Sequence, residues 1–102
     1  MLNVILQDGL KDYLKQHHHN DISLSLTHSD YATGNILSMS PHIRYKAPDA
    51  LDLYDTYMVD GVRVYVEKDV VAYDDTLEFV EESLLGVHRC HVVGIKLDNK
   101  LI

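Results

Sequence analysis

The only cluster that combines cysteine and histidine is the segment HRCH at residues 88–91. Imidazole and thiolate side chains bind zinc and other transition metals, and cysteine thiolates hold iron–sulfur clusters. If the segment is a strand, His88 and Cys90 share one face and His91 points to the other, because successive side chains alternate. Two ligands on one face leave a metal ion incompletely coordinated.

A metal site at this segment needs a further ligand, for which His28 and His42 are candidates. Structural zinc sites usually have four ligands with cysteine pairs at short spacing, and this sequence has no such pattern. A free cysteine in a strand is more often a small core side chain. Two hypotheses follow: a zinc or iron–sulfur site that uses Cys90, His88 and His91, and a packed thiol with no bound cofactor.

A nucleophilic cysteine needs a neighbouring base and a lowered thiol pKa. His88 or His91 is close enough in sequence to serve as that base, but the middle of a strand covers the sulfur. The grouped acids, such as Asp74 and Asp75, lie in turns and on polar strand faces, where solvation explains them better than acid–base catalysis. We therefore assign no catalytic residue and expect that the protein is not an enzyme.

The run His17-His18-His19 is a second candidate for metal binding. Consecutive residues of a helix point about 100° apart, so three in a row do not converge on one ion. Polar or cationic side chains are common where a helix ends. This run is therefore expected to mark the end of a helix.

The composition of the chain indicates which classes of binding partner and which cellular compartment to expect. Sixteen acidic and nine basic side chains give a net charge of −7, which disfavours nucleic acid and anionic membranes as partners. The N-terminus lacks the features of a signal peptide, and no apolar run reaches the roughly eighteen residues of a membrane span. A single cysteine forms no internal disulfide and fits a reducing compartment, so we expect a cytoplasmic protein with one domain over residues 1–102.

The segment YDTYMVDGVRVYV at residues 54–66 predicts a β-hairpin. Asp60-Gly61 is a typical two-residue turn between runs rich in Val and Tyr. The expected pairs are Val59 with Val62, Tyr57 with Val64, and Asp55 with Val66. A slip of one residue would put Arg63 in the core, so the register is well specified.

The rest of the chain predicts one early helix and several strands. Asp8 is placed to cap the start of the helix and Asn20 to cap its end. Pro41 is expected to interrupt a strand over 37–45 or to place it at an edge, a bulge or a break. The other expected elements are strands over 2–6, 22–26, around 77–79 and over 87–97, a loop over 29–35, one turn of helix within 67–73, and a connection over 81–86.

Five pieces of the chain follow one another in a recognisable order: LKDYLKQ, DISLSLTHS, YMVDGVRVYVEKDVV, TLEFV and HVVGIKL, within residues 10–97. This order resembles the HesB/IscA-like family of A-type iron–sulfur carriers. The likeness is greatest to its short HesB-like proteins, which include a group with a Cys-Cys or Cys-selenocysteine motif. The resemblance implies an α+β, mainly β fold, a mostly antiparallel β-sandwich with one N-terminal helix.

The chain departs from that family at the positions that ligate a cluster. The resemblance places paired cysteines in the loop after the second strand, which here is SDYATGN at residues 29–35. It also implies a C-terminal Cys-x-Cys segment, where this chain ends in DNKLI. Cys90 matches neither position, so no cluster ligand is carried over.

The same loop is a candidate partner-binding site, because loops on a rigid scaffold often carry function. Tyr31, Thr33 and Asn35 are the candidate contacts, and a plain surface turn is the equal alternative. We expect a non-enzymatic binding or accessory module without cluster ligands, which acts on a protein partner or as a homo-oligomer. The alternative is a metal or iron–sulfur binder that uses Cys90 with nearby histidines.

Overall fold

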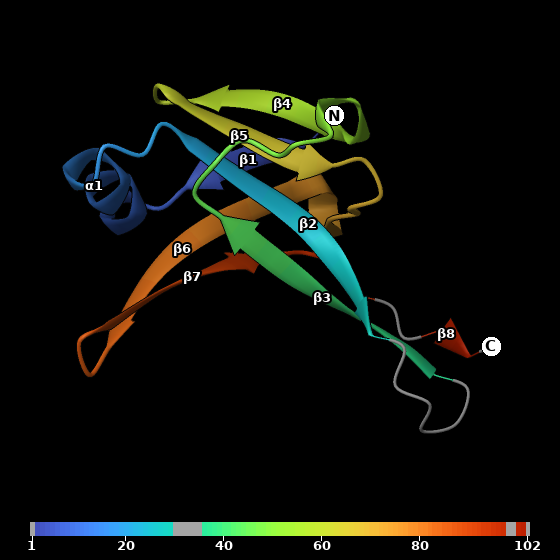
Figure 1. Ribbon diagram of the computed structural model, residues 1–102. Coiled ribbons are helices and arrows are strands. Elements are labelled where there is room, and N and C mark those ends of the chain that lie inside the picture. The colour runs from blue at the N-terminus through green and yellow to red at the C-terminus, as the bar shows by residue number, and fades with distance from the viewer. Residues whose placement is uncertain (1, 30–35, 98–99, 102) are drawn as a thin grey trace.

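The computed structural model describes residues 2–29, 36–97 and 100–101 (Figure 1). One α-helix, two short 3₁₀ helices and eight strands lie in these ranges. In chain order they are β1 Asn3–Leu6, α1 Asp8–Gln16, β2 Asp21–Ser29, β3 Ile36–Arg44, η1 Leu51–Leu53, β4 Tyr54–Val59, β5 Val62–Glu67, η2 Tyr73–Asp75, β6 Thr76–Leu84, β7 Val87–Val93 and β8 Lys100–Leu101.

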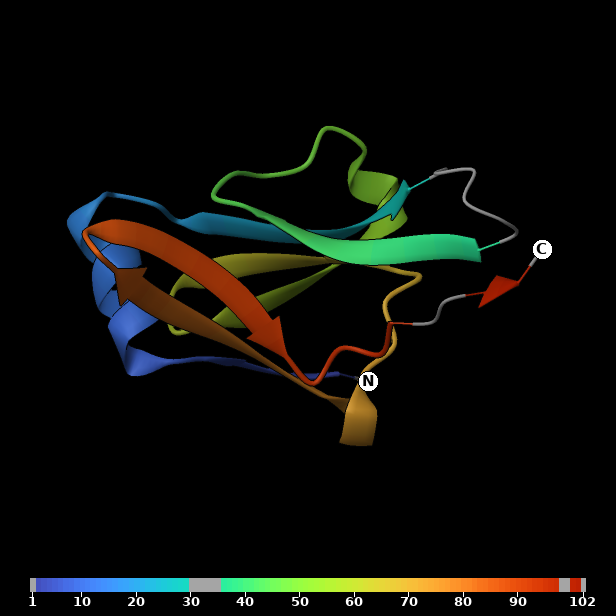
Figure 2. The same ribbon diagram turned by 90° about the horizontal axis from the view of Figure 1, so that it is seen from below.

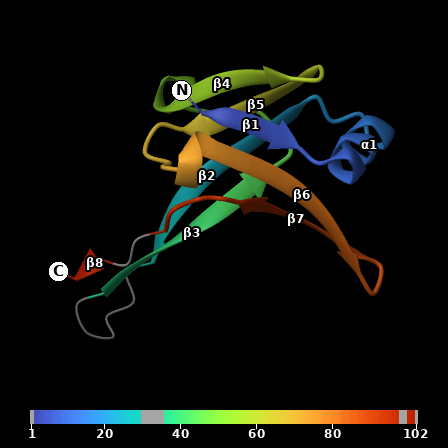
Figure 3. The same ribbon diagram turned by 180° about the vertical axis from the view of Figure 1, so that it is seen from behind.

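The strands form two sheets. The order is β1-β6-β7 in the three-stranded sheet and β4-β5-β2-β3-β8 in the five-stranded one. Pairs β1–β6 and β2–β5 are parallel, and the other pairs are antiparallel. Seen from behind, β1 and β6 pass in front of β2 and β3 (Figure 3). The predicted α+β, mainly β sandwich with one N-terminal helix is confirmed.

The predicted hairpin has the expected register. Asp60 and Gly61 form the turn with positive φ angles, and all three expected pairs are present. Alternate β5 side chains enter the core while Arg63 stays exposed. The core lies between the sheets and under α1, and its fully buried members are Leu10, Leu14, Ile22, Leu24, Val64, Val66, Leu77 and Phe79.

The two helix caps differ from the sequence-based expectation. Asp8 is the first helical residue, and Gln7 is the N-cap. The Gln7 side chain accepts a hydrogen bond from the Leu10 amide at 3.3 Å, because its length lets it reach back into the first turn. At the other end the chain leaves the helix at His17, and His18 takes a positive φ of 57°, so Asn20 is not the cap.

Other predicted elements also differ in part from the structure. Pro41 lies at a sheet edge, one of the expected positions, because at this level β2 is the only described neighbour of β3; the expected interruption of the strand is absent, since β3 runs through Pro41 without a break. Residues 67–73 contain a turn and no α-helix; the helical turn is η2. The expected connection over 81–86 is mostly strand, because β6 continues to Leu84. The strand expected over 87–97 is shorter, because β7 stops at Val93, before Gly94 with a positive φ of 95°.

The β6–β7 hairpin extends away from the body of the molecule. Its turn lies at the opposite end from the C-terminus (Figures 1 and 2). In the part of the chain that the structure describes, no helix is long and apolar enough to cross a membrane.

Candidate functional site

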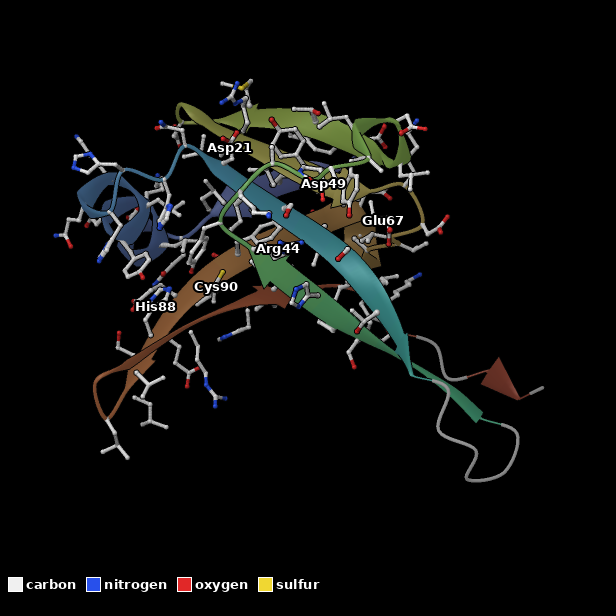
Figure 4. The ribbon with its side chains drawn as sticks, viewed as in Figure 1. Asp21, Arg44, Asp49, Glu67, His88 and Cys90 are labelled. Atoms are coloured by element: carbon white, nitrogen blue, oxygen red, sulfur yellow. The ribbon has the colours of Figure 1, made fainter. Side chains whose placement is uncertain are left out.

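Titratable side chains from four parts of the chain meet where α1 approaches the β6–β7 hairpin. We call this the His88 cluster; its members are Tyr13, Tyr45, Glu81, His88 and Cys90. Tyr13 comes from α1, Tyr45 directly follows β3, and the other three project from β6 and β7. His88 and Cys90 lie on the same side of β7, the half-buried side (Figure 4).

Both ring nitrogens of His88 have a partner. Nδ1 lies 3.3 Å from Oε1 of Glu81, and Nε2 is hydrogen-bonded to the Tyr45 hydroxyl. Because a carboxylate only accepts, His88 donates through Nδ1, and in the neutral ring Nε2 then accepts from Tyr45. Hydrogen bonds from Ser83 and from His88 lower the pKa of Glu81, which keeps it a carboxylate.

Aromatic stacking on Tyr13 holds the imidazole ring of His88 in place. The rings of Tyr13 and His88 are parallel, with centroids 3.6 Å apart. His17 stacks on the same tyrosine at 4.1 Å, and His19 stacks on Tyr45 at 5.1 Å. The histidines at the end of α1 therefore pack against tyrosines instead of converging on one point.

Cys90 is half-buried at the inner end of the cluster. Burial raises the pKa of its thiol to about 11, although the hydrogen bond with Tyr45 partly opposes this effect. Burial and then the nearby Cys90 raise the pKa of Tyr45 as well. Both groups are protonated at neutral pH, and a protonated thiol is a weak nucleophile and a weak metal ligand.

The residues predicted to bind metal are only partly brought together. His91 lies on the exposed face of β7, where its Nδ1 is 3.4 Å from Oε2 of Glu82. His42 is exposed on β3, and the side chain of His28 lies outside the described residues. Among the described residues, no three His, Cys, Asp or Glu side chains are grouped to hold a metal ion. Metal binding by Cys90, His88 and His91 stays a prediction.

The predicted loop contacts Tyr31, Thr33 and Asn35 lie outside the described residues. The sequence-based account missed Tyr13, Tyr45 and Glu81 as neighbours of His88. One signal was present: had Leu85-Gly86 been interpreted as a hairpin turn, Glu81 and His88 would have been expected on one face of paired strands.

A second feature is the apolar end of the β6–β7 hairpin, which we call the hairpin tip; it comprises Leu84, Leu85 and Val87. These side chains are 63%, 95% and 56% exposed. Leu85 and Gly86 form the two-residue turn, and Leu85 has a positive φ of 52°. Such a conformation is unusual for leucine and typical of Asn or Gly.

The whole arrangement can be compared with known proteins. The model of the CC/Se motif containing family matches residues 2–95. The chain belongs to this family. No curated protein and no solved structure matches it. The chain has a single cysteine, Cys90, which lies on β7.

Proposed function

We propose that this protein is a non-enzymatic binding or accessory module that acts through contacts with other proteins. We also propose that it is related to HesB/IscA-like proteins but lacks their cluster ligands, and that it works in the cytoplasm. The single cysteine supports the lack of cluster ligands, since it does not allow a cysteine pair. It also supports the cytoplasmic location, since it does not allow an internal disulfide.

The observation that carries this proposal is the hairpin tip. Leu85 is 95% exposed and in the left-handed region, which costs a non-glycine residue roughly 1 kcal/mol. A leucine at this turn contributes nothing to the core and weakens the turn. Apolar side chains that are exposed together mark interaction sites more often than single ones do. A partner protein that covers Leu84, Leu85 and Val87 would explain why these three apolar side chains are exposed together.

The His88 cluster supports a structural role for the half-buried polar groups. Both ring nitrogens of His88 are engaged, and Cys90 is protonated at neutral pH. Ligation of a metal by either side chain requires the loss of these interactions. The cluster is better suited to fixing the hairpin against α1 and the end of β3, which holds the hairpin tip in place.

Site-specific photocrosslinking in cells tests the proposal. A photoreactive amino acid replaces Leu85 in one variant and Met58, which is 67% exposed on β4, in a matched control. We expect a discrete protein adduct from position 85 and no matching adduct from position 58. Equal, diffuse labelling from both positions would argue against the hairpin tip as a contact surface.

A further inference from the structure

β7 is an edge strand of the three-stranded sheet. In the described residues it pairs with β6 on one side and with no strand on the other. The end of β3 comes close to β7, whereas the part of β7 next to the hairpin turn has no described segment beyond it (Figures 1 and 3). Natural edge strands are often protected by Pro, Lys or a bulge. The segment VHRCHVV at 87–93 has no Pro or Lys and one charged side chain, Arg89, so this edge carries little of the usual protection against strand pairing.

Hydrogen bonds on β6 show which backbone groups of β7 face that edge. The Gln7 amide donates to the Phe79 carbonyl at 2.9 Å, and the Glu81 amide donates to the Gln7 side chain at 3.2 Å. The polar backbone groups of Phe79 and Glu81 thus point towards β1. Because these groups alternate along a strand, those of Val80 and Glu82 point towards β7.

The register then assigns the groups of β7. Val80 pairs with His91 and Glu82 with Arg89, so the backbone groups of these β7 residues point towards β6. The alternate residues of β7 direct their N–H and C=O groups to the open edge. They are His88, Cys90 and Val92.

We propose that two copies of this chain pair through β7, antiparallel and centred on Cys90. This proposal goes beyond the proposed function, because the second copy pairs along β7 and not through Leu85. In this register the N–H and C=O groups of His88, Cys90 and Val92 meet those of Val92, Cys90 and His88 of the second copy. Main-chain hydrogen bonds of this kind provide the affinity of strand addition.

The side chains of the exposed face are self-complementary in that register. Val87 lies opposite Val93 of the second copy, and both valines are exposed in the single chain. Arg89 lies opposite His91 of the second copy. Glu82 is the register partner of Arg89 and lies 3.4 Å from His91 in its own chain, so a carboxylate flanks this pair on each side.

Another edge strand, β4, lacks this symmetry. A pairing of two β4 strands centred on Thr56 would place Asp55 opposite Tyr57, which is half-buried against the core. The β7 register instead places valine against valine at both ends. It also leaves Leu85 of each copy beyond the paired segment, where a different partner can still reach it.

A charge-exchange series measured by analytical ultracentrifugation tests the pairing. We expect the wild-type protein to form dimers, and Val87→Lys or Val93→Glu alone to weaken the dimer by roughly tenfold, because each substitution changes two symmetric pairs at once. The double variant V87K/V93E places Lys opposite Glu twice and should restore the dimer. Leu51→Lys, at a 57% exposed position on η1, is the matched control and should have no effect.

The ultracentrifugation and crosslinking results together separate the β7 pairing from the proposed contact at the hairpin tip. A monomeric wild-type protein, or a dimer that the double variant does not restore, overturns this pairing. If the pairing fails while Leu85 still crosslinks to another protein in cells, the proposed function stands and only the second copy is wrong. If the dimer forms but Leu85 gives no specific adduct, the proposed contact at the hairpin tip fails while the pairing stands.

Discussion

At the scale of single residues, the His88 cluster is a continuous set of hydrogen bonds that links both sheets. Tyr45 connects the end of β3 to His88 on β7, and His88 connects in turn to Glu81 on β6. Stacking on Tyr13 adds α1 to the same unit. Because the site is half-buried, loss of one partner leaves a polar atom with poor access to water, which is costly.

Tyr45→Phe tests this linkage. Removal of the hydroxyl leaves Nε2 of His88 without its donor, and we expect the free energy of unfolding to fall by about 1 kcal/mol. Urea denaturation provides the measurement. Tyr73→Phe, on an exposed ring, is the control and should change stability by less than about 0.5 kcal/mol. Equal effects of the two substitutions would contradict the assigned role of Tyr45.

The raised pKa of Cys90 predicts a pH dependence of stability. The unfolded chain loses the thiol proton near its ordinary pKa of 9.0, whereas the folded chain keeps it up to about 11. Between these values the unfolded state binds fewer protons, so the free energy of unfolding falls as pH rises. The stabilising contribution of the protonated thiol is therefore fully present below pH 9.0, and it is lost as the pH rises to about 11.

The control for this pH dependence is Cys90→Ser, which has no thiol to titrate. Urea denaturation of both proteins across the alkaline range should show a steeper decline for the wild type. Parallel curves would mean that the thiol ionises equally well in the folded and unfolded chains, and that burial does not protect it.

At the scale of elements, the two hairpins show what the sequence can predict. Asp60-Gly61 suits a tight turn and lies between alternating apolar residues, so the β4–β5 register was predictable. Leu85-Gly86 lacks the Asn or Asp that signals such a turn, so the β6–β7 hairpin was missed. The packing of its β6 half, not its turn, holds it in place, because Leu77 and Phe79 are fully buried.

Leu85→Asn separates folding from function at this turn. Asn adopts a positive φ more readily than Leu, so we expect a gain of about 0.5 kcal/mol in stability. The same change removes the most exposed apolar side chain of the hairpin tip. Partner adducts formed from a photoreactive residue at position 84 should therefore decrease while thermal stability rises. A loss of stability would show that Leu85 contributes to folding.

At the scale of the whole molecule, the alternating strands and the single early helix were enough to predict a mainly β domain, and the resemblance to HesB/IscA-like proteins implied the sandwich. Local patterns did not predict the His88 cluster, because its members come from α1, β6, β7 and the end of β3. The β6–β7 hairpin brings Glu81, His88 and Cys90 together, and only the packing of α1 and the end of β3 against that hairpin adds Tyr13 and Tyr45. We propose that this sandwich acts through the hairpin tip and the edge of β7.

Native mass spectrometry of the untagged protein, purified without air, tests this central claim most directly. It reports the oligomeric state and any bound metal in one spectrum. We expect a dimer whose mass is that of two bare polypeptide chains. A mass excess that matches zinc or an iron–sulfur cluster, and that is lost in Cys90→Ser, would contradict the account and favour a metal site at Cys90.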